Sequence, residues 1–336
     1  MEIILTHIIL AVVLFLIQNW IGERSYSKGY IRFSLLDDRD EALSINFAIK
    51  VFSPIVYLIL CVALLQFFKL NNLNENIINV VYYYLIFRIL LIILYERITI
   101  VNWARIFFYY FSIIIVSIII YRNFINSVET LLPNFSEIKN EIWLLVIVFI
   151  YQIGNGIQDK RIDNPLYEPE QAFLPELKRR KKKYINRRFK EFSQKFDEAI
   201  NAICNKDESF KIIIYSIIIF ENFNRPRIIR IIERIYCKFT KRLTSQGIMQ
   251  INSVVPISDL ESVKKGTFFL NEKYLIYKEE EYKYNLFRRI IKQQNPDKKY
   301  VRQVLFISKA IIDSQNEKTN FLELYSEIKS EFNLYD

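Results

Sequence analysis

The sequence predicts a multi-pass α-helical membrane domain of about five spans, followed by a soluble domain that is mostly α-helical. Hydrophobic residues make up 52% of the 336 residues, and the long apolar runs lie in the first half of the chain. Residues 1–158 carry 11 basic and 11 acidic side chains, whereas residues 159–336 carry 35 and 25, so the net charge of +10 belongs to the second half. An apolar, neutral half joined to a basic, polar half is typical of a membrane domain fused to a soluble domain.

The predicted membrane domain covers residues 1–158. Its expected spans are the apolar runs at residues 3–19, 51–68, 78–95, 104–121 and 142–158. Each run is near the length needed to cross about 30 Å of hydrocarbon. The first run has no basic residues before it and no small-x-small cleavage site, so we interpret it as a retained span and not as a signal peptide.

Few side chains in the predicted spans suggest chemistry. His7 and Arg88 are ionisable at membrane depth, and such residues can mark a transport pathway. We expect His7 to be packed among helices, and Arg88 to have a partner on its own helix or at the lipid interface. The three cysteines lack the spacing of a disulfide framework or a zinc site, so we predict no metal and no cofactor. Anchoring is therefore the expected role of this domain.

Residues 159–183 form a predicted linker, because three prolines favour extended structure at its start. A basic run at residues 178–190 follows, with nine positive charges in 13 residues. Its position close to a membrane exit favours anionic lipid headgroups over nucleic acid phosphates as the partner, and a solvated helix face is the simplest alternative. The expected headgroup-binding residues are Lys178, Arg179, Arg180, Lys181, Lys182 and Lys183.

The predicted soluble domain covers residues 184–336. Helical patterns are found at residues 184–204, 208–221, 226–241, 259–265, 280–294, 300–314 and 319–332. Short strands are expected at residues 248–251 and, with a weaker pattern, at residues 267–277. Ser258 and Glu261 predict a capping box for a short helix that ends at Gly266.

The predicted helix 208–221 is apolar on every face but too short to cross a bilayer, so we expect it to be the central helix of the soluble domain. Glu221 lies at its end, because Arg225 and Pro226 favour a break. Apolar surroundings and the negative end of the helix dipole both disfavour the charged carboxylate. A carboxyl group that stays protonated near neutral pH can serve as a general acid.

A plain ion pair is the alternative role for Glu221. The next helical pattern places Arg227, Arg230 and Arg234 on one face, and any of them could neutralise the carboxylate. The isoleucines of the same segment, Ile228, Ile231, Ile232 and Ile235, are expected to face inward.

Residues 244–253 read TSQGIMQINS. A glutamate that ends a buried helix, followed by a Ser/Thr-rich turn into Gly-Ile-Met-Gln, resembles the lytic transglycosylase and goose-type lysozyme superfamily. The resemblance covers residues 208–266 and implies a lysozyme-like α+β domain in which Glu221 cleaves the glycan of peptidoglycan. Asn222 departs from the serine that often follows the glutamate, and the family's later Tyr-Asn-Ala-Gly motif is absent. The sugar groove implied by the resemblance includes Ser245, Gly247, Ile248, Met249 and Gln250.

The mechanism that the resemblance implies needs one carboxyl group. Glycosidases that use two would need a second carboxylate at a set distance. Asp259 is the candidate near Glu221 in the sequence, and its place beside a helix cap predicts a structural role instead.

Two functions follow from the sequence. The first is a membrane-anchored enzyme that cleaves the peptidoglycan glycan or its lipid-linked precursor. The second is a membrane effector or scaffold, for example in bacterial defence, whose lysozyme-like domain binds a partner or ligand without catalysis. The Lys and Arg residues of the loops place residues 159–336 on the cytoplasmic side of a bacterial inner membrane. An enzyme acting on the mature cell wall would need the periplasmic or extracellular side.

Overall fold

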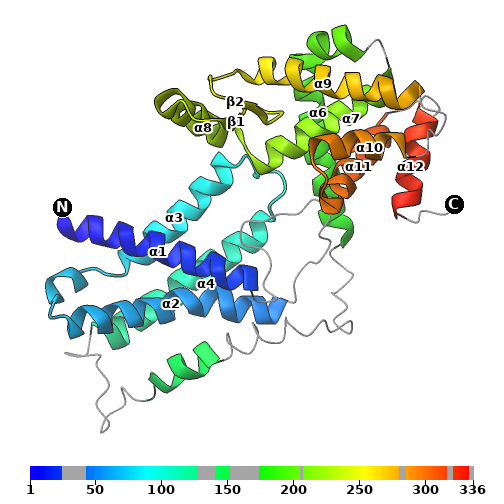
Figure 1. The fold of residues 1–336 in the computed structure, drawn as a ribbon. Coiled ribbons are helices and arrows are strands. Elements are labelled where there is room, and N and C mark those ends of the chain that lie inside the picture. The colour runs from blue at the N-terminus through cyan, green and yellow to red at the C-terminus, as the bar shows by residue number, and fades with distance from the viewer. Residues whose placement is uncertain are drawn as a thin grey trace. The chain divides into compact units, whose positions relative to one another are not determined.

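The computed structural model describes residues 1–24, 43–126, 141, 143–151, 174–204, 207–279, 285–315 and 321–332. The described chain is almost entirely helical, with one two-stranded hairpin (Figure 1). It divides into two compact units. The first consists of Met1–Ile93 and Val101–Pro175, and the second of Leu94–Ile100 and Glu176–Asp336. The short segment Leu94–Ile100 therefore belongs to the same unit as the C-terminal helices.

The first unit is built from apolar helices. Its long elements are α1 (Glu2–Arg24), α2 (Leu43–Phe67), α3 (Asn79–Leu94) and α4 (Trp103–Ile120), with short 3₁₀ and π turns η1 (Asn71–Asn74) and η2 (Tyr121–Ile125). Among the described residues, three helices are long and apolar enough to cross a membrane: Glu2–Trp20, Lys50–Phe67 and Trp103–Ile125.

The predicted spans 78–95 and 142–158 do not appear as described helices long enough to cross a membrane. Helix α3 is apolar but has only 16 residues. The predicted span 142–158 is described as helical at residues 143–151, and the remainder lies outside the described residues. Three spans are thus compatible with a membrane protein, and a total of five stays a prediction.

The two ionisable side chains predicted at membrane depth, His7 and Arg88, each have a partner within the first unit. His7 is buried, and its Nε2 lies 3.1 Å from the carbonyl oxygen of Leu73. Arg88 donates a 2.8 Å hydrogen bond to the hydroxyl of Tyr84, one turn earlier on α3. Both findings confirm the structural roles predicted for these residues. Apolar side chains also cover the outside of the helices, as expected for a lipid-facing surface; examples are Leu16, Leu64, Phe107 and Phe111.

The second unit contains seven labelled helices among its described residues: α6 (Leu174–Cys204), α7 (Glu208–Asn224), α8 (Arg227–Thr240), α9 (Asp259–Glu279), α10 (Leu286–Gln294), α11 (Lys298–Ile312) and α12 (Leu322–Phe332). Most of the predicted helices are confirmed. The predicted linker is wrong at its C-terminal end, because residues 174–183 belong to α6, whereas residues 159–173 lie outside the described residues. Residues 267–277 form part of α9, so the strand predicted there is also wrong.

Helix α7 is the central helix of the second unit, as predicted. All but one of its residues from Phe210 to Phe223 are buried, and it packs against α10 and α11. Its start is capped by Asp207, whose carboxylate accepts a 3.1 Å hydrogen bond from the amide of Phe210. Its end follows from Pro226: Arg225 leaves the helical region with φ −126° and ψ 80°, and α8 begins directly after the proline.

The hairpin consists of β1 (Thr244–Gln246) and β2 (Ile251–Ser253), paired antiparallel with Ser245 opposite Asn252. Residues 247–250 form the turn, so the strand predicted at residues 248–251 is wrong for all but Ile251. Gly247 has φ +69°, and a Cβ there would lie 2.4 Å from the Cβ of Ser262. Only glycine allows both this backbone conformation and so close an approach.

Helix α9 begins as predicted but does not end at Gly266. Ser258 caps it: its hydroxyl accepts a 3.1 Å hydrogen bond from the amide of Glu261, and the Glu261 carboxylate accepts one from the Ser258 amide. The helix continues through Gly266 to Glu279. A Cβ at Gly266 would lie 2.9 Å from the side chain of Met249, so this glycine permits close packing and does not terminate the helix.

Candidate functional site

Glu221 lies in the last turn of α7 and is almost fully enclosed, with 5% of its surface exposed. Its Oε1 accepts a 2.9 Å hydrogen bond from the hydroxyl of Tyr300 at the start of α11. Its Oε2 accepts a hydrogen bond from the side-chain amide of Gln250 in the hairpin turn. The carboxyl group thus joins three elements that are distant in sequence, and the predicted proximity of Glu221 and Gln250 is confirmed.

Burial raises the pKa of Glu221 to about 7, although the hydrogen bonds from Tyr300 and Gln250 and the charge of Arg225 act in the opposite direction. The effect of lost hydration on the pKa is therefore larger than the opposing effect of the two hydrogen bonds and of Arg225. When the carboxyl group is protonated, its hydroxyl can donate to Tyr300, because a phenol oxygen accepts as well as donates. Glu221 is then able to hold or release a proton near neutral pH.

Protonation of Glu221 is also linked to folding. The pKa in the folded state is raised above the ordinary value of 4.5, so the folded protein binds this proton more tightly than the unfolded chain. The stabilisation is fully present below about pH 4.5 and is lost as the pH rises through 7. A shift of this size corresponds to about 3 kcal/mol.

The other residues implied for a sugar groove serve the fold. Ile248 and Met249 are fully buried, and the Met249 side chain packs on Gly266. The Met249 amide donates to the hydroxyl of Ser262, and its carbonyl accepts from the side chain of Gln294, which fixes the turn from both sides. Ser245 lies within β1. Of the predicted groove residues, Gln250 is therefore the one that forms a hydrogen bond with Glu221.

Gln250 adopts a backbone conformation that is unfavourable for a residue with a side chain. Its φ is +51°, in the left-handed region, which costs roughly 1 kcal/mol for a residue with a side chain. Its amide closes the turn by donating a 3.2 Å hydrogen bond to the carbonyl of Gly247. The turn thereby directs the half-buried Gln250 side chain at the carboxyl group of Glu221.

Tyr300 is the site residue that sequence reasoning missed. It lies 79 positions from Glu221, and the packing of α11 on α7 brings the two together. Its ring meets Phe220 edge-on at 4.8 Å, and the side chain is buried. A tyrosine in the first turn of an amphipathic helix carries no local signal of this role.

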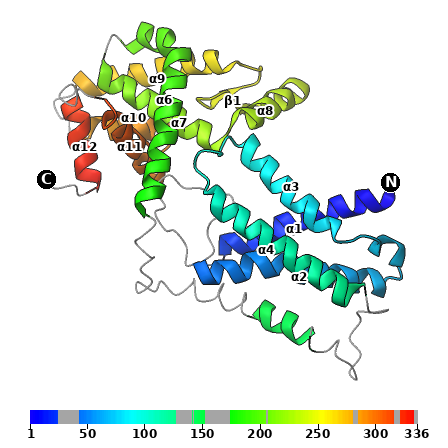
Figure 2. The ribbon, with the colours of Figure 1, turned by 180° about the vertical axis from the view of Figure 1, so that it is seen from behind.

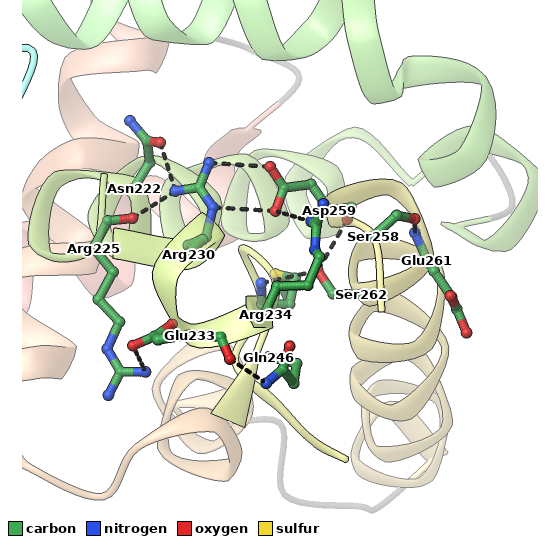
Figure 3. Close-up of polar contacts among 11 residues, drawn as sticks. Asn222, Arg225, Arg230, Glu233, Arg234, Gln246, Ser258, Asp259, Glu261 and Ser262 are labelled. Atoms are coloured by element: carbon green, nitrogen blue, oxygen red, sulfur yellow. Dashed lines mark hydrogen bonds and ion pairs between the residues drawn. The ribbon is translucent and has the colours of Figure 1, made fainter. Parts of the chain in front are cut away.

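Arg230 pairs with Asp259 and not with Glu221 (Figure 3). Its Nε and Nη2 donate to the two oxygens of Asp259, both at 3.1 Å. Its Nη1 donates to the side chain of Asn222 and to the carbonyl of Arg225. Arg234 lies 4.0 Å from Asp259. Arg230 and Arg234 therefore do not form the ion pair considered for Glu221, and Asp259 is held in a structural salt bridge.

The orientation predicted for α8 is wrong. Its polar face points at the hairpin and α9, where Arg230 is buried and Gln246 donates to the carbonyl of Glu233. Its apolar face is exposed at Ile231, Ile232, Ile235, Tyr236 and Phe239. Periodicity separates the two faces of a helix but does not say which face lies inward. In α8 the polar face lies inward because the hydrogen-bond partners of Arg230 are inside the unit, and a buried guanidinium requires such partners.

The basic run of α6 is partly used within the fold. Lys181 is buried, and Lys182 forms a 3.2 Å salt bridge with Asp313. Arg179 and Lys183 are exposed, Arg180 is half-buried, and the side chain of Lys178 lies outside the described residues. Exposed cations for anionic headgroups thus remain at Arg179 and Lys183, whereas Lys181 contributes to the interior.

The segment Leu94–Ile100 is held tightly in the second unit. Glu96 forms a salt bridge with Arg188 of α6. The buried Arg97 lies over the ring of Phe223, 4.8 Å from its centroid, and its Nη2 is 3.5 Å from the Phe223 carbonyl. The segment therefore meets α7 two residues beyond Glu221.

No protein-family model matches the chain, and no curated protein or solved structure matches it either. The described residues contain no group of three or more His, Cys, Asp or Glu side chains that could hold a metal ion. The three cysteines are buried free thiols. Glu221 and its hydrogen-bond partners are therefore the candidate site among the described residues.

Proposed function

We propose that the chain is a membrane-anchored enzyme that cleaves the glycan of peptidoglycan or its lipid-linked precursor, with Glu221 as the single general acid/base. The observation that carries the proposal is the enclosed carboxyl group of Glu221, held between Tyr300 and Gln250 at a helix end beside the hairpin turn. Burial raises its pKa to about 7. An acid with this pKa is half-protonated at neutral pH, so it can both donate a proton and accept one within a catalytic cycle.

The proposed reaction uses one carboxyl group in two roles. Glu221 protonates the glycosidic oxygen as the bond to the anomeric carbon breaks, and the leaving sugar departs as an alcohol. The resulting carboxylate accepts the proton of a hydroxyl of the same sugar as that oxygen closes onto the anomeric carbon. Asp259 is engaged by Arg230, which supports a route that needs no second carboxylate.

Gln250 is the proposed point of substrate entry. Its side chain covers Oε2 of Glu221 and is half-buried, whereas Tyr300 on the other oxygen is fully buried. Rotation of Gln250 away from the carboxyl group would free Oε2 for a glycosidic oxygen and leave Tyr300 in place. The amide could then bind the sugar, as amide side chains in ligand sites do.

The membership of Leu94–Ile100 in the second unit supports a further span. This segment and the C-terminal helices form one compact unit, and we therefore propose that they lie on one side of the membrane. The chain between them must then cross an even number of times. Helix α4 supplies one crossing, and the helical residues 143–151 fit a second. On the cytoplasmic side favoured by the basic loops, the lipid-linked precursor is the available glycan; the mature polymer requires the opposite side.

The full-length protein in detergent micelles should release products from purified peptidoglycan or from the lipid-linked disaccharide, measured by mass spectrometry. Ring closure by the sugar's own hydroxyl predicts products that are one water lighter than those of hydrolysis. Products that incorporate labelled water would contradict the single-carboxyl reaction. An absence of cleavage of either substrate would remove the enzymatic proposal.

A second candidate, ligand binding without catalysis, has its own support in the second unit. A cavity of about 560 Å³ lies between α6 and α9, with an apolar floor that includes Ala202, Ile203 and Phe268. Three lysines and one glutamate also line it, so the net positive charge suits an anionic ligand: Lys195, Lys264, Lys265 and Glu198. Under this alternative, Glu221 is an internal tie between α7, α11 and the hairpin, and its replacement would leave function intact.

A further inference from the structure

Helix α8 presents an apolar face to the outside of the second unit. Ile232, Ile235 and Tyr236 are about half exposed, and Phe239 is 81% exposed. The side opposite these residues carries Arg230, Glu233 and Cys237, which are fixed by Asp259, Gln246 and the hairpin. The helix is therefore held by its polar side, the reverse of a helix that packs on a hydrophobic core.

The open end of the hairpin carries further exposed apolar side chains close to the last turn of α8. Leu243, which precedes β1, is 67% exposed, and Val254 and Val255, which follow β2, are 52% and 61% exposed. Because Thr244 pairs with Ser253, Leu243 just before β1 and Val254 just after β2 lie at the same end of the hairpin. Cys237 lies 3.9 Å from the carbonyl oxygens of Arg242 and Ser253, so this end of the hairpin adjoins the last turn of α8.

The exposed charged residues of α8 and of residues 241–243, which lead to β1, are all basic. Arg227, Lys238, Lys241 and Arg242 are exposed. Glu233, the acidic residue of α8, forms a 3.2 Å salt bridge with Arg225 on the side facing the domain. An apolar face bordered by cations is the composition of helices that lie in the interface of an anionic membrane.

The segment Leu94–Ile100 links this part of the second unit to a candidate membrane span. Leu94–Ile100 connects α3 with α4, and α4 is long and apolar enough to span. Residues just before the start of such a helix lie at the membrane–water boundary, where Trp103 is a typical anchor. Arg97 fixes this segment to Phe223, and α8 begins four residues later at Arg227.

We propose that α8, together with Leu243, Val254 and Val255, is an interfacial surface that lies on an anionic phospholipid membrane. The isoleucines, Phe239 and the hairpin residues enter the boundary between headgroups and acyl chains, and the four cations contact lipid phosphates. Docking of this surface would place the end of α7, and with it Glu221, near the bilayer. The inference does not depend on the activity of Glu221.

The test uses the full-length protein in nanodiscs that contain phosphatidylglycerol. A polarity-sensitive fluorophore is attached at F239C on α8 and, as the control, at E323C on α12, which lies at the opposite end of the second unit (Figures 1 and 2). The three native thiols are buried. Phospholipids with brominated acyl chains should quench the label at residue 239 strongly and the label at residue 323 little, and soluble iodide should do the reverse.

Variants separate the apolar and charged contributions. I232E with I235E should abolish lipid quenching at residue 239, because both charges would enter the acyl region, whereas L322E on α12 should leave it unchanged. Replacing Lys238 by Gln should weaken docking about fivefold in phosphatidylglycerol and have little effect in phosphatidylcholine. The variants alter exposed side chains, so unchanged circular dichroism is the check of folding.

Two outcomes would overturn the proposal. Quenching by iodide but not by brominated lipid at residue 239 would mean that the face is in water. Protection from both quenchers would mean that protein covers it, either the first unit or a second copy of the chain.

Discussion

Glu221→Gln should lower the rate of glycan cleavage by about 10²-fold or more, because it removes the transferable proton while keeping the size of the side chain. The fold should survive, since the new amide can accept from Tyr300 and donate to Gln250 once the Gln250 amide rotates. The measurement is the initial rate of product release by the full-length proteins, compared at equal concentration and at pH 7.

Gln250→Ala is the variant to compare with Glu221→Gln, because it separates substrate binding from proton transfer. It removes the contact over Oε2 but leaves Glu221 and Tyr300 in place, so cleavage should persist with weaker substrate binding. Equal rates for the wild-type protein and Glu221→Gln would remove Glu221 from the mechanism. Loss of activity in both variants with loss of helical structure would instead indicate that the carboxyl group holds the fold together.

Arg230→Ala should destabilise the second unit by about 3–5 kcal/mol, the range for breaking a buried ion pair by removing one partner. Arg230 is 5% exposed, and its removal leaves Asp259, at 15% exposed, without its bidentate partner. The Asn222 side chain and the Arg225 carbonyl lose the same donor. The unfolding free energy can be measured by pulse proteolysis in urea on the detergent-solubilised protein.

Arg234→Ala is the matched control on the same helix. Its guanidinium is 40% exposed and lies 4.0 Å from Asp259, so the loss should stay below about 1 kcal/mol. Arg230→Ala should also expose the amides of α8 to hydrogen exchange, because this side chain joins α8 to α9. A loss for Arg230→Ala no larger than for Arg234→Ala would contradict the role given to the buried pair.

The helical architecture was predictable because it depends on local patterns. The apolar run of α7 indicated a buried helix, Pro226 marked its end, and Ser258 with Glu261 marked the start of α9. The predicted helix end at Gly266 was wrong. Glycine is a common helix terminator, whereas here it makes room for the side chain of Met249. The distinction depends on a tertiary contact that the sequence does not encode locally.

Part of the site, Glu221 and Gln250, was also predictable from local sequence patterns. Gln250 follows Glu221 by 29 positions, with α8 and β1 between them, and the resemblance to a known motif predicted that the two residues lie together. Tyr300 comes from α11, and its contact depends on how that helix packs on α7. The orientation of α8 was misjudged because the arginine face is satisfied by Asp259 and Asn222, which only the folded structure brings within reach.

The most direct test of the account is a titration of the Glu221 carboxyl group in the folded protein. Infrared difference spectra between the wild-type protein and Glu221→Gln isolate the carbonyl stretch of this protonated side chain. We expect the band to be present at pH 5 and to disappear with a midpoint near pH 7, because burial raises the pKa of Glu221 to about 7. A midpoint near the ordinary value of 4.5 would mean that Glu221 is a carboxylate at neutral pH, unable to serve as the general acid.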